Sequence, residues 1–237
     1  LVVVNGTFFS FETNRNLNVV VKDSKLVSNH SNSVEGKGKD TLTFRHPFSS
    51  AIGINKKREA DVAWILADSM TKKLYASQWP LAALKDSVKE HTLADFLYAT
   101  NIVSHFSSSP SFHRWKMKTA IGGGPVLLQN GSIQISNEEE LKFTGKAIND
   151  KHPRTAMGYT KDNKLIILVI EGRNKVAHGA TLNQEAQILK DLGCVEALNL
   201  DGGGSSCLLV NGKETITPAD KGEQRAVPAV FMIKRKT

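Results

Sequence analysis

Short apolar runs alternate with polar turns along most of this chain, a pattern typical of strands joined by tight hairpins. Four such runs in the first third read as strands: 1–4, 19–21, 51–54 and 62–66. The polar stretch 23–40, rich in Ser, Asn, Gly and Lys, is expected to be an exposed loop. A turn at 68–73 sends the chain back through 74–76, which predicts a hairpin with 62–66.

Further hairpins are expected in the second half of the chain. Asn130-Gly131 separates the apolar runs 126–128 and 132–135, and Asn-Gly between such runs is a strong hairpin signal. Another hairpin is expected over 155–170. Its second strand, 164–170, is apolar on both faces and should be central in a sheet covered from both sides. A third hairpin over 208–216 and a closing strand over 226–233 complete the pattern.

Helical spacing of apolar residues is found in two segments. Residues 81–106 are expected to hold one or two helices. In 181–193, Thr181 and Gln184 fit a capping box, and Gly193 stands where a left-handed residue ends a helix. Because strands outnumber helices, we expect an α+β fold: one domain over residues 1–237, with mainly antiparallel or mixed β-sheet and a few flanking helices.

Composition supports a folded globular chain. The protein has 237 residues, of which 40% are hydrophobic before its 18 glycines are counted. This share excludes a disordered chain or a collagen-like fibre. The longest uninterrupted apolar run is Leu165 to Ile170, whereas a membrane-spanning helix needs about 20 residues. No transmembrane segment is therefore expected.

The charge balance favours anionic partners. The chain carries 31 basic and 23 acidic residues, a formal charge of +8, which attracts phosphates, nucleic acid or acidic glycans. The basic residues are scattered in small groups without interleaved aromatic residues or a nucleic-acid motif: 56–58, 72–73, 116 with 118, and 234–236. Nucleic acid is accordingly not an expected partner.

The cysteines do not predict a disulfide framework, and the histidines do not predict a metal site. Two cysteines do not make a disulfide framework; both are expected to be buried, and a bridge between Cys194 and Cys207 is left open. The histidines show no metal-ligand spacing, so no metal or other cofactor is expected. A Ca²⁺ ion held by carboxylates near Asp201 is left open.

The densest candidate site is the run from Asn199 to Ser206. Asp201 follows a strand of buried type and precedes three glycines and two serines: Gly202, Gly203, Gly204, Ser205 and Ser206. Consecutive glycines permit positive φ and close approach of the backbone to a ligand, and successive amides in such a turn can bind an anion. The alternative is a plain tight turn in which Asp201 accepts hydrogen bonds from its own loop.

Other candidate residues also stand at predicted strand ends, where ligand sites tend to gather. They are small, charged or amide residues: Asn5, Gly6, Gly122, Gly123, Gly124, Arg154, Glu171, Arg173 and Arg225.

With these motifs the chain resembles the phosphodiester glycosidase family. The matching segments are 5–9, 122–125 with 130–131, 154–158, 171–173, 179–193, 197–206, and Arg225 with the final strand. They follow the family's order, and the run 197–206 is the most specific. Three positions depart from the family pattern: Thr7 replaces a usual glycine, Glu171 a usual Asp, and Gln184 a usual Glu. Gln184 can still complete a capping box, but it argues against a catalytic acid at that position.

The resemblance implies hydrolysis of the glycosidic bond of a sugar-1-phosphodiester, such as an N-acetylglucosamine phosphodiester. Phosphate leaves more readily than a sugar hydroxyl, so a general acid is less necessary than in ordinary glycosidases. The transition state needs a cationic clamp on the phosphate and a carboxylate near the oxocarbenium-like carbon. Arg154, Arg173 and Arg225 are the expected clamp, because guanidinium groups bind phosphate in a bidentate way. Asp201 is the expected nucleophile, base or charge stabiliser, with Glu171 second.

The expected catalytic set is therefore Asp201, Glu171 and Arg154. The expected substrate-binding set is Asn5, Gly6, Gly123, Gly124, Arg173, His178, Asn199, Gly202, Gly203, Gly204, Ser205, Ser206 and Arg225. Several of these residues also have an alternative, structural role. Asn5 and Asn199 either bond sugar hydroxyls or close strand-end turns, and each arginine can instead make a structural ion pair. His178 is either an acid or base or simply solvated. Without a histidine in its motif, Ser205-Ser206 does not suggest a serine hydrolase.

The expected partner is a phosphorylated glycan or a sugar-phosphodiester. The chain starts at Leu1 rather than Met, so it is expected to be processed or trimmed. As a glycosidase of this kind it is expected to be secreted or periplasmic, with surface anchoring through an upstream segment left open. The alternative function is a non-catalytic glycan-binding or phosphoglycan-binding domain of the same fold, suggested by Thr7, Glu171 and Gln184. A phosphodiesterase that cuts a phosphorus–oxygen bond would be expected to need a metal cluster.

Overall fold

The computed structural model describes residues 1–29, 33–68, 70–92, 94–96, 98, 112–220 and 222–235. In this part of the chain every strand pairing is antiparallel. The same residues include no helix with the length and apolar character that crossing a membrane requires.

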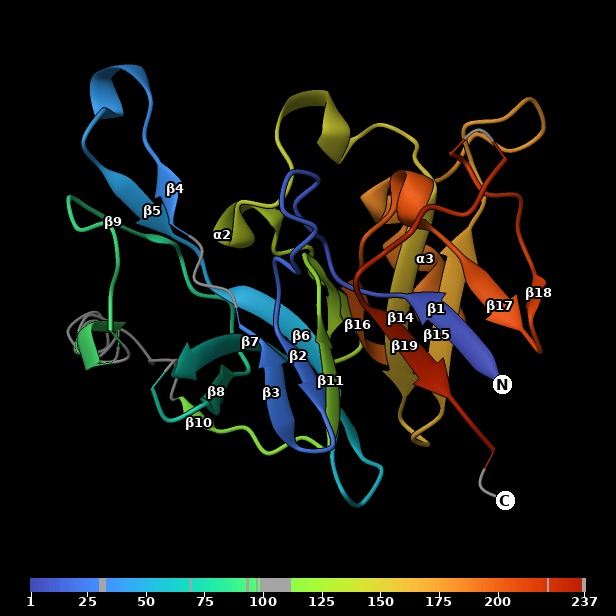
Figure 1. Cartoon of the computed structure of the whole chain (residues 1–237), viewed down its shortest axis with the longest axis horizontal. Coiled ribbons are helices and arrows are strands. Elements are labelled where there is room, and N and C mark those ends of the chain that lie inside the picture. The colour runs from blue at the N-terminus through green and yellow to red at the C-terminus, as the bar shows by residue number, and fades with distance from the viewer. Residues whose placement is uncertain are drawn as a thin grey trace.

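Two large sheets form the body of the molecule (Figure 1). The seven-stranded sheet has the order β10 (His113–Arg114), β8 (Lys73–Ser77), β7 (Ala60–Asp68), β6 (Ser49–Ile54), β11 (Thr119–Gly122), β2 (Val20–Lys22) and β3 (Lys25–Ser28). The five-stranded sheet has the order β13 (Ser132–Ile133), β12 (Val126–Gln129), β16 (Cys194–Asn199), β14 (Arg154–Thr160) and β15 (Leu165–Ile170).

Two smaller sheets and a few helices complete the fold. The four-stranded sheet has the order β18 (Lys213–Glu214), β17 (Leu208–Val210), β1 (Val2–Asn5) and β19 (Val230–Ile233). The three-stranded sheet has the order β4 (Val34–Glu35), β5 (Phe44–His46) and β9 (Leu84–Asp86). The helical elements are α2 (Asn137–Glu140), α3 (Leu182–Asp191) and the 3₁₀ turns Gly38–Asp40, Gly145–Ile148 and Gly203–Ser205.

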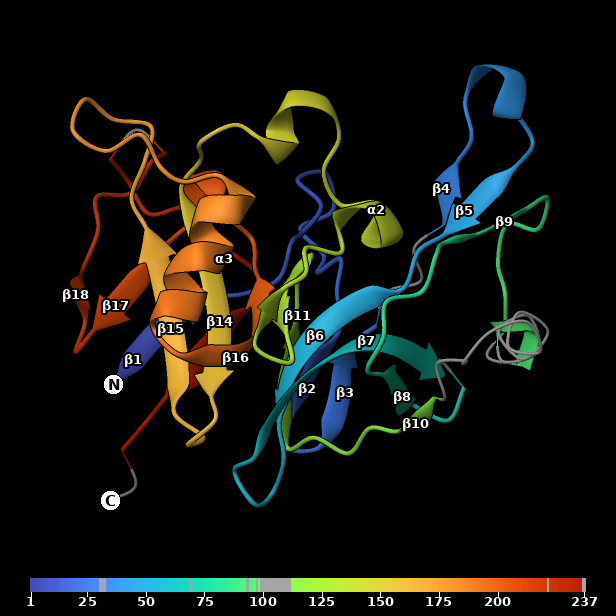
Figure 2. The same ribbon diagram turned by 180° about the vertical axis from the view of Figure 1, so that it is seen from behind.

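The main core joins residues from both halves of the chain. Val4 of β1, Trp64 of β7 and Leu198 of β16 belong to one buried apolar cluster. Helix α3 lies against the other face of the five-stranded sheet, as the view from behind shows (Figure 2), and its Leu182 and Leu189 are buried in the apolar cluster there. The structure is therefore mostly antiparallel β-sheet with a few helices, which agrees with an α+β class. The single-domain expectation stays a prediction, and the shared core is consistent with it.

Most expected hairpins are present. β7 pairs with β8, β12 with β13, β14 with β15, and β17 with β18. Asn130 and Gly131 both have positive φ, 50° and 76°, as a two-residue hairpin turn of type I′ requires. Helix α3 begins with the expected capping box: Thr181 and Gln184 exchange side-chain and backbone hydrogen bonds. Gly193 follows the helix with φ of 85°.

The expectation that 164–170 forms a central strand is wrong, because β15 is an edge strand of its sheet. Its apolar pattern has another cause. Leu165, Ile167 and Val169 pack against the main core, whereas Ile166 and Leu168 pack toward α3. An edge strand enclosed between two layers thus shows the same two-faced apolar pattern as a central one.

Two other expectations also need correction. The stretch 23–40 is more than a loop, because it contains β3, β4 and a 3₁₀ turn. The segment 81–106 is only partly helical, because it also contains strand β9, in which Leu84–Asp86 pairs with β5. Residues 94–96 and 98 are helical, while 93, 97 and 99–111 lie outside the described residues.

The cysteines are buried, as expected, and the bridge that the sequence left open is not formed. Cys194 and Cys207 are both free thiols. Burial raises the pKa of the Cys194 thiol to about 11, so this group is an inert apolar residue rather than a nucleophile.

Candidate functional site

Asp201 lies at the end of a buried strand, in a turn that its own loop stabilises. Strand β16 ends at Asn199, and the chain then enters the 3₁₀ turn Gly203–Ser205, where Gly203 has φ of 60°. Burial raises the pKa of the Asp201 carboxyl to about 6, although the Ser205 hydroxyl, the Arg225 charge and the Gly202 amide all favour its ionised form. A carboxyl group with this pKa is ionised at pH 7 and can still accept a proton near neutrality.

Two guanidinium groups pack directly on the glycines that follow Asp201. A Cβ atom at Gly204 would overlap the guanidinium of Arg225, and one at Gly203 would lie 3.2 Å from both terminal nitrogens of Arg173. These glycines therefore admit two cations that any side chain would displace. The sequence predicted that a ligand could approach the backbone closely at this turn. In the structure, two arginine side chains of the protein itself make that close approach.

Arg225 is fixed in place by two side chains. Its Nε donates to Oδ2 of Asp220 at 2.9 Å, and its Nη1 donates to Oγ of Ser205 at 3.5 Å. Ser205 is buried and also hydrogen-bonds to Asp201, so its hydroxyl lies between the carboxylate and the guanidinium. Asp201, Ser205 and Arg225 therefore form one connected polar group.

Arg173 contacts His152, a residue that the sequence analysis did not select. Nη2 of Arg173 lies 3.3 Å from Nδ1 of His152. Burial lowers the pKa of His152, and the charges of Arg154 and Arg173 lower it further, so the imidazole is neutral at pH 7. His152 stands two residues before Arg154 at the start of β14, and the strand-end rule that selected Arg154 would also have found it. Arg173 itself has φ of 61°, a left-handed conformation uncommon for a residue with a side chain.

Arg154 lies behind this surface rather than on it. It is 3% exposed, its Nε donates to the carbonyl oxygen of Ala180 at 3.0 Å, and its Nη2 donates to that of Asp150 at 3.3 Å. Burial lowers its pKa, while the charge of Glu185 in α3 opposes that shift. These contacts hold the 180 loop against β14. The catalytic role of Arg154 stays a prediction.

Glu171 has both carboxylate oxygens occupied. It accepts hydrogen bonds from Nδ2 of Asn174 at 2.6 Å and from the backbone amide of Thr217 at 2.8 Å, and these bonds, the Thr217 amide first, lower its pKa. No described contact joins Glu171 to Asp201. The structure thus gives Glu171 a loop-bridging position, and its role in chemistry stays a prediction. His178 is exposed.

The remaining predicted residues form a backbone frame beneath the Asp201 turn. Buried Asn5 donates from Nδ2 to the carbonyl oxygen of Asp201 at 2.6 Å, and the Asp201 amide donates to the carbonyl oxygen of Gly6 at 3.1 Å. Asn199 donates to the carbonyl oxygen of Gly124 at 2.7 Å, and a Cβ atom at Gly123 would overlap the Asn199 carbonyl. Asn5 and Asn199 thus make the contacts of their turn-closing alternative.

The departures from the family pattern have structural partners. Oγ1 of Thr7 donates to Oδ1 of Asn16 at 2.8 Å, and Gln184 completes the capping box of α3. Ser206 is buried and accepts a hydrogen bond from Thr155 at 3.2 Å, so it belongs to the interior of the turn.

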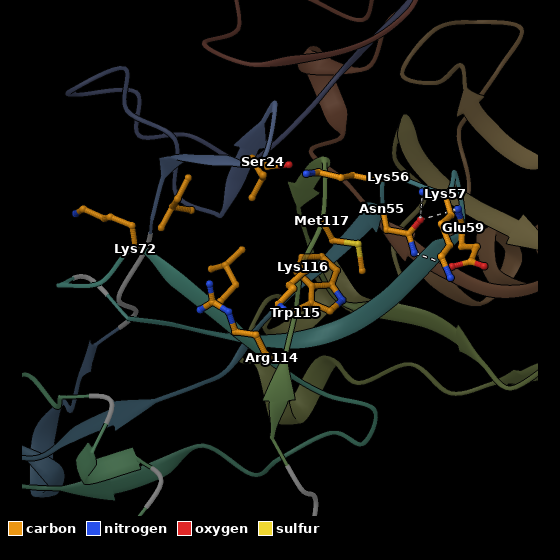
Figure 3. Close-up of a pocket in the computed structure, with 13 residues that line it drawn as sticks. Ser24, Asn55, Lys56, Lys57, Glu59, Lys72, Arg114, Trp115, Lys116 and Met117 are labelled. Atoms are coloured by element: carbon orange, nitrogen blue, oxygen red, sulfur yellow. Dashed lines mark hydrogen bonds between the residues drawn. The ribbon is translucent and has the colours of Figure 1, made fainter.

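A cavity of about 440 Å³ lies elsewhere, on the outer face of the seven-stranded sheet (Figure 3). Trp115 and Met117 line it, and cations that are scattered along the sequence gather around it: Lys56, Lys57, Lys72, Arg114 and Lys116. None of the predicted site residues lines this cavity, so its size does not locate the predicted chemistry.

Comparison with known proteins supplies the deciding observation, because the phosphodiester glycosidase family model matches residues 1–234. The chain belongs to the phosphodiester glycosidase family. Its resemblance in sequence to that family is thereby confirmed over nearly the whole length.

Other known proteins match parts of the chain. The mouse N-acetylglucosamine-1-phosphodiester alpha-N-acetylglucosaminidase is 33% identical over 108 residues, which cover 42% of this chain and 21% of the mouse protein. The SPbeta prophage-derived protein YomE of Bacillus subtilis is 40% identical over 80 residues, 34% of this chain and 12% of that protein. These matched regions are thus a small part of the longer relatives.

Solved structures share the fold. The zebrafish N-acetylglucosamine-1-phosphodiester alpha-N-acetylglucosaminidase catalytic domain, auto-inhibited by its pro-peptide, matches with a TM-score of 0.63 and 25% identity, over all of this chain and 64% of that one. A hypothetical protein from Synechocystis matches with a TM-score of 0.51 at 18% identity, over 91% of this chain and 48% of that one, which shows likeness of fold alone.

Proposed function

We propose that this phosphodiester glycosidase hydrolyses the glycosidic bond of a sugar-1-phosphodiester, with N-acetylglucosamine phosphodiesters as the first candidate substrates. The observation that carries the proposal is the connected group of Asp201, Ser205 and Arg225, with Arg173 packed on the adjacent glycine. Family membership and the names of the mouse and zebrafish relatives support the same bond type.

In this proposal the arginines act on the phosphate. Arg173 and Arg225 lie on consecutive glycines, so their cations flank one short stretch of backbone. Guanidinium groups so arranged stabilise the negative charge that grows on the departing phosphate as the glycosidic bond breaks. The neutral imidazole of His152 limits the repulsion around Arg173, because it adds no third positive charge at pH 7.

Asp201 acts on the sugar. Its ionised carboxylate stabilises the oxocarbenium-like carbon as nucleophile, base or counter-charge, and water completes the hydrolysis. A phosphate monoester and a free sugar are the products. Because the Arg225 charge favours the ionised form of Asp201, the residue that binds phosphate also prepares the carboxylate. Phosphodiester-linked sugars of cell-wall or capsular polymers fit this chemistry, in keeping with the proposed secreted or periplasmic location.

Sugar release from UDP-N-acetylglucosamine and from a methyl N-acetylglucosamine phosphodiester tests the proposal. Wild type and an Asp23→Asn control, changed in an exposed turn, should release reducing sugar at equal rates. Asp201→Asn should lower kcat at least about a hundredfold while substrate binding persists, because it removes the charge and leaves the shape. Full turnover in Asp201→Asn would refute the assigned role.

The same assay separates the alternative function. If wild type binds these phosphodiesters and releases no sugar from any of them, the domain is a non-catalytic glycan-binding or phosphoglycan-binding module. The structural partners of Thr7 and Gln184 weigh against that alternative, because two of the three departures that suggested it have structural explanations.

A further inference from the structure

Two histidines and an aspartate meet in the three-stranded sheet, far from Asp201 along the sequence. His46 ends β5, Asp86 ends the neighbouring strand β9, and His91 follows five residues later. The antiparallel pairing of β5 with β9 sets His46 opposite Leu84 and so brings the strand ends together. One ligand atom from each of the three side chains lies within 4.8 Å of the other two.

The two oxygens of Asp86 face different histidines. Oδ2 lies 2.7 Å from Nε2 of His91, and Oδ1 lies 3.4 Å from Nε2 of His46. The backbone amide of Val88 donates to Oδ1 at 2.8 Å, which fixes the carboxylate between the rings. The ring centroids of His46 and His91 are 4.6 Å apart at an angle of 80°. Both imidazoles therefore present the same nitrogen to one carboxylate.

A hydrogen bond to Asp86 satisfies Nε2 of His91, but no hydrogen bond satisfies Nε2 of His46. The His46 side chain is 3% exposed, and its buried Nε2 has no hydrogen-bond partner, even though Oδ1 of Asp86 is the nearby acceptor. A buried polar nitrogen without a partner costs free energy, and such groups in native proteins call for a specific explanation. A cation between the three side chains would satisfy this nitrogen.

We propose that His46, Asp86 and His91 bind a divalent transition-metal ion, with Zn²⁺ the best match. Two imidazole nitrogens and one carboxylate oxygen form a donor set that suits zinc, whereas Ca²⁺ and Mg²⁺ prefer oxygen ligands. Zinc bonds of about 2.0–2.2 Å in tetrahedral geometry place ligand atoms about 3.3 Å apart. The His46–Asp86 separation of 3.4 Å already meets this, and His91 needs to move back by about 0.6 Å from Asp86.

The surroundings resemble those of a metal ligand set. Nδ1 of His91 lies 3.9 Å from Oδ2 of Asp95, so a second carboxylate places negative charge beside the ring, as carboxylates commonly do around metal-binding histidines. Phe96 packs against both imidazoles, with ring centroids 6.2 Å from His46 and 5.4 Å from His91. This aromatic contact limits water around the two imidazoles, while the Asp86 side chain is 36% exposed.

The position of His46, Asp86 and His91 suggests that the metal ion stabilises the fold. The three-stranded sheet lies at the opposite end of the long axis of the molecule from β17 and β18 (Figures 1 and 2). An ion here would join β5, β9 and the segment beginning at His91, in a region where the sheets have only three short strands. The inference does not depend on the proposed glycosidase activity.

Metal titration of the chelator-stripped protein tests the proposal. Wild type should bind one Zn²⁺ per chain in competition with a chromophoric chelator, and its Tm should rise. His91→Gln and Asp86→Asn should each weaken binding at least about tenfold. His113→Gln, which changes an exposed histidine of β10, should bind as wild type does.

Co²⁺ provides a readout that needs no variant. Wild-type protein should give the intense visible absorption of tetrahedral Co²⁺, and equimolar Zn²⁺ should abolish it. Failure of wild type to bind stoichiometric Zn²⁺, a Co²⁺ spectrum like that of the free ion, or unchanged affinity in a folded His91→Gln variant would overturn the proposal.

Discussion

At Asp201, burial and hydrogen bonding act on one carboxyl group in opposite directions. Burial alone favours the neutral acid, whereas the Ser205 hydroxyl and the Arg225 charge favour the carboxylate, and the outcome is a pKa of about 6. Glu171 shows the contrasting case, because hydrogen bonds from Thr217 and Asn174 lower the pKa of this half-buried carboxylate. The sequence offers both as carboxylates near glycine and arginine, but their surroundings suit them to different tasks.

Glu171→Gln tests this distinction between the two carboxylates. Gln keeps an acceptor oxygen for the Thr217 amide, so the loop should hold its place. If the proposed glycosidase activity is present, we expect kcat/KM to change by less than about threefold, against at least about a hundredfold for Asp201→Asn. Steady-state kinetics of the two variants on one substrate provide the comparison, and equal losses would return Glu171 to the catalytic set.

Gly204→Ala tests the packing of arginine on the glycine turn. The added methyl group overlaps the Arg225 guanidinium, so this cation must shift away from the turn. We expect kcat/KM to fall about a hundredfold, the scale seen when one stabilising donor is lost. Gly212→Ala is the matched control: its φ of 79° adds backbone strain, but nothing lies within 4 Å of the new methyl group. Equal activity of both variants would contradict the assigned contact.

Among the elements, helix α3 is predicted well by its capping box and apolar stripe, but its buried glutamate, Glu185, is not predicted from the sequence. The capping box and the apolar stripe are legible in the sequence, and the helix forms as expected. Glu185 on the buried side is fully enclosed, and neither carboxylate oxygen has a hydrogen-bond partner. Burial raises its pKa to about 8, with the Arg154 charge opposing the shift. At neutral pH this glutamate is therefore mostly a protonated, neutral group.

Glu185→Gln should change how stability depends on pH. The unfolded chain releases the Glu185 proton near pH 4.5, while the folded chain keeps it until about pH 8, so the wild-type free energy of unfolding falls as pH rises through this window. Gln removes that loss, and the variant should gain stability relative to wild type by about 1 kcal/mol or more between pH 5.5 and 8. Urea unfolding at the two pH values measures it, with exposed Glu138→Gln as the control. A constant difference across pH would show that Glu185 is ionised throughout.

Local signals in the sequence predict elements better than they predict sheet order. The Asn130-Gly131 turn and the Thr181 cap depend on neighbouring residues alone, and both are confirmed. The position of β15 depends on which layers enclose it, so an apolar pattern that fits a central strand belongs to an edge strand.

In the candidate site, too, the features formed by neighbouring residues were predicted, and those formed by distant segments were not. The Asp201 turn was predicted because the residues are contiguous in sequence. The Ser205–Arg225 contact, the Arg173–His152 contact and the meeting of His46, Asp86 and His91 all join segments that only the folded chain brings together. Glu171 was selected by its place beside Gly172-Arg173, but its side chain contacts Asn174 and Thr217 instead.

At the scale of the whole molecule, the two large sheets share one core that also carries the site. Leu198 of β16 is fully buried in that core, three residues before Asp201. Leu198→Ala should lower the free energy of unfolding by about 2–5 kcal/mol, because it leaves a cavity between the sheets. Leu42→Ala, at a position 79% exposed, should change it by less than about 0.5 kcal/mol. Similar urea midpoints for the two variants would contradict the assigned core.

The pH dependence of kcat/KM, measured for wild type and Arg225→Gln on one sugar-phosphodiester, tests the central claim most directly. Wild type should lose activity as the pH falls below about 6, where Asp201 takes up its proton. Removing the Arg225 charge should move this inflection to higher pH, because that charge favours the carboxylate. An inflection that is absent in wild type, or that stays at the same pH in Arg225→Gln, would show that Asp201 and Arg225 do not act together at the reacting bond.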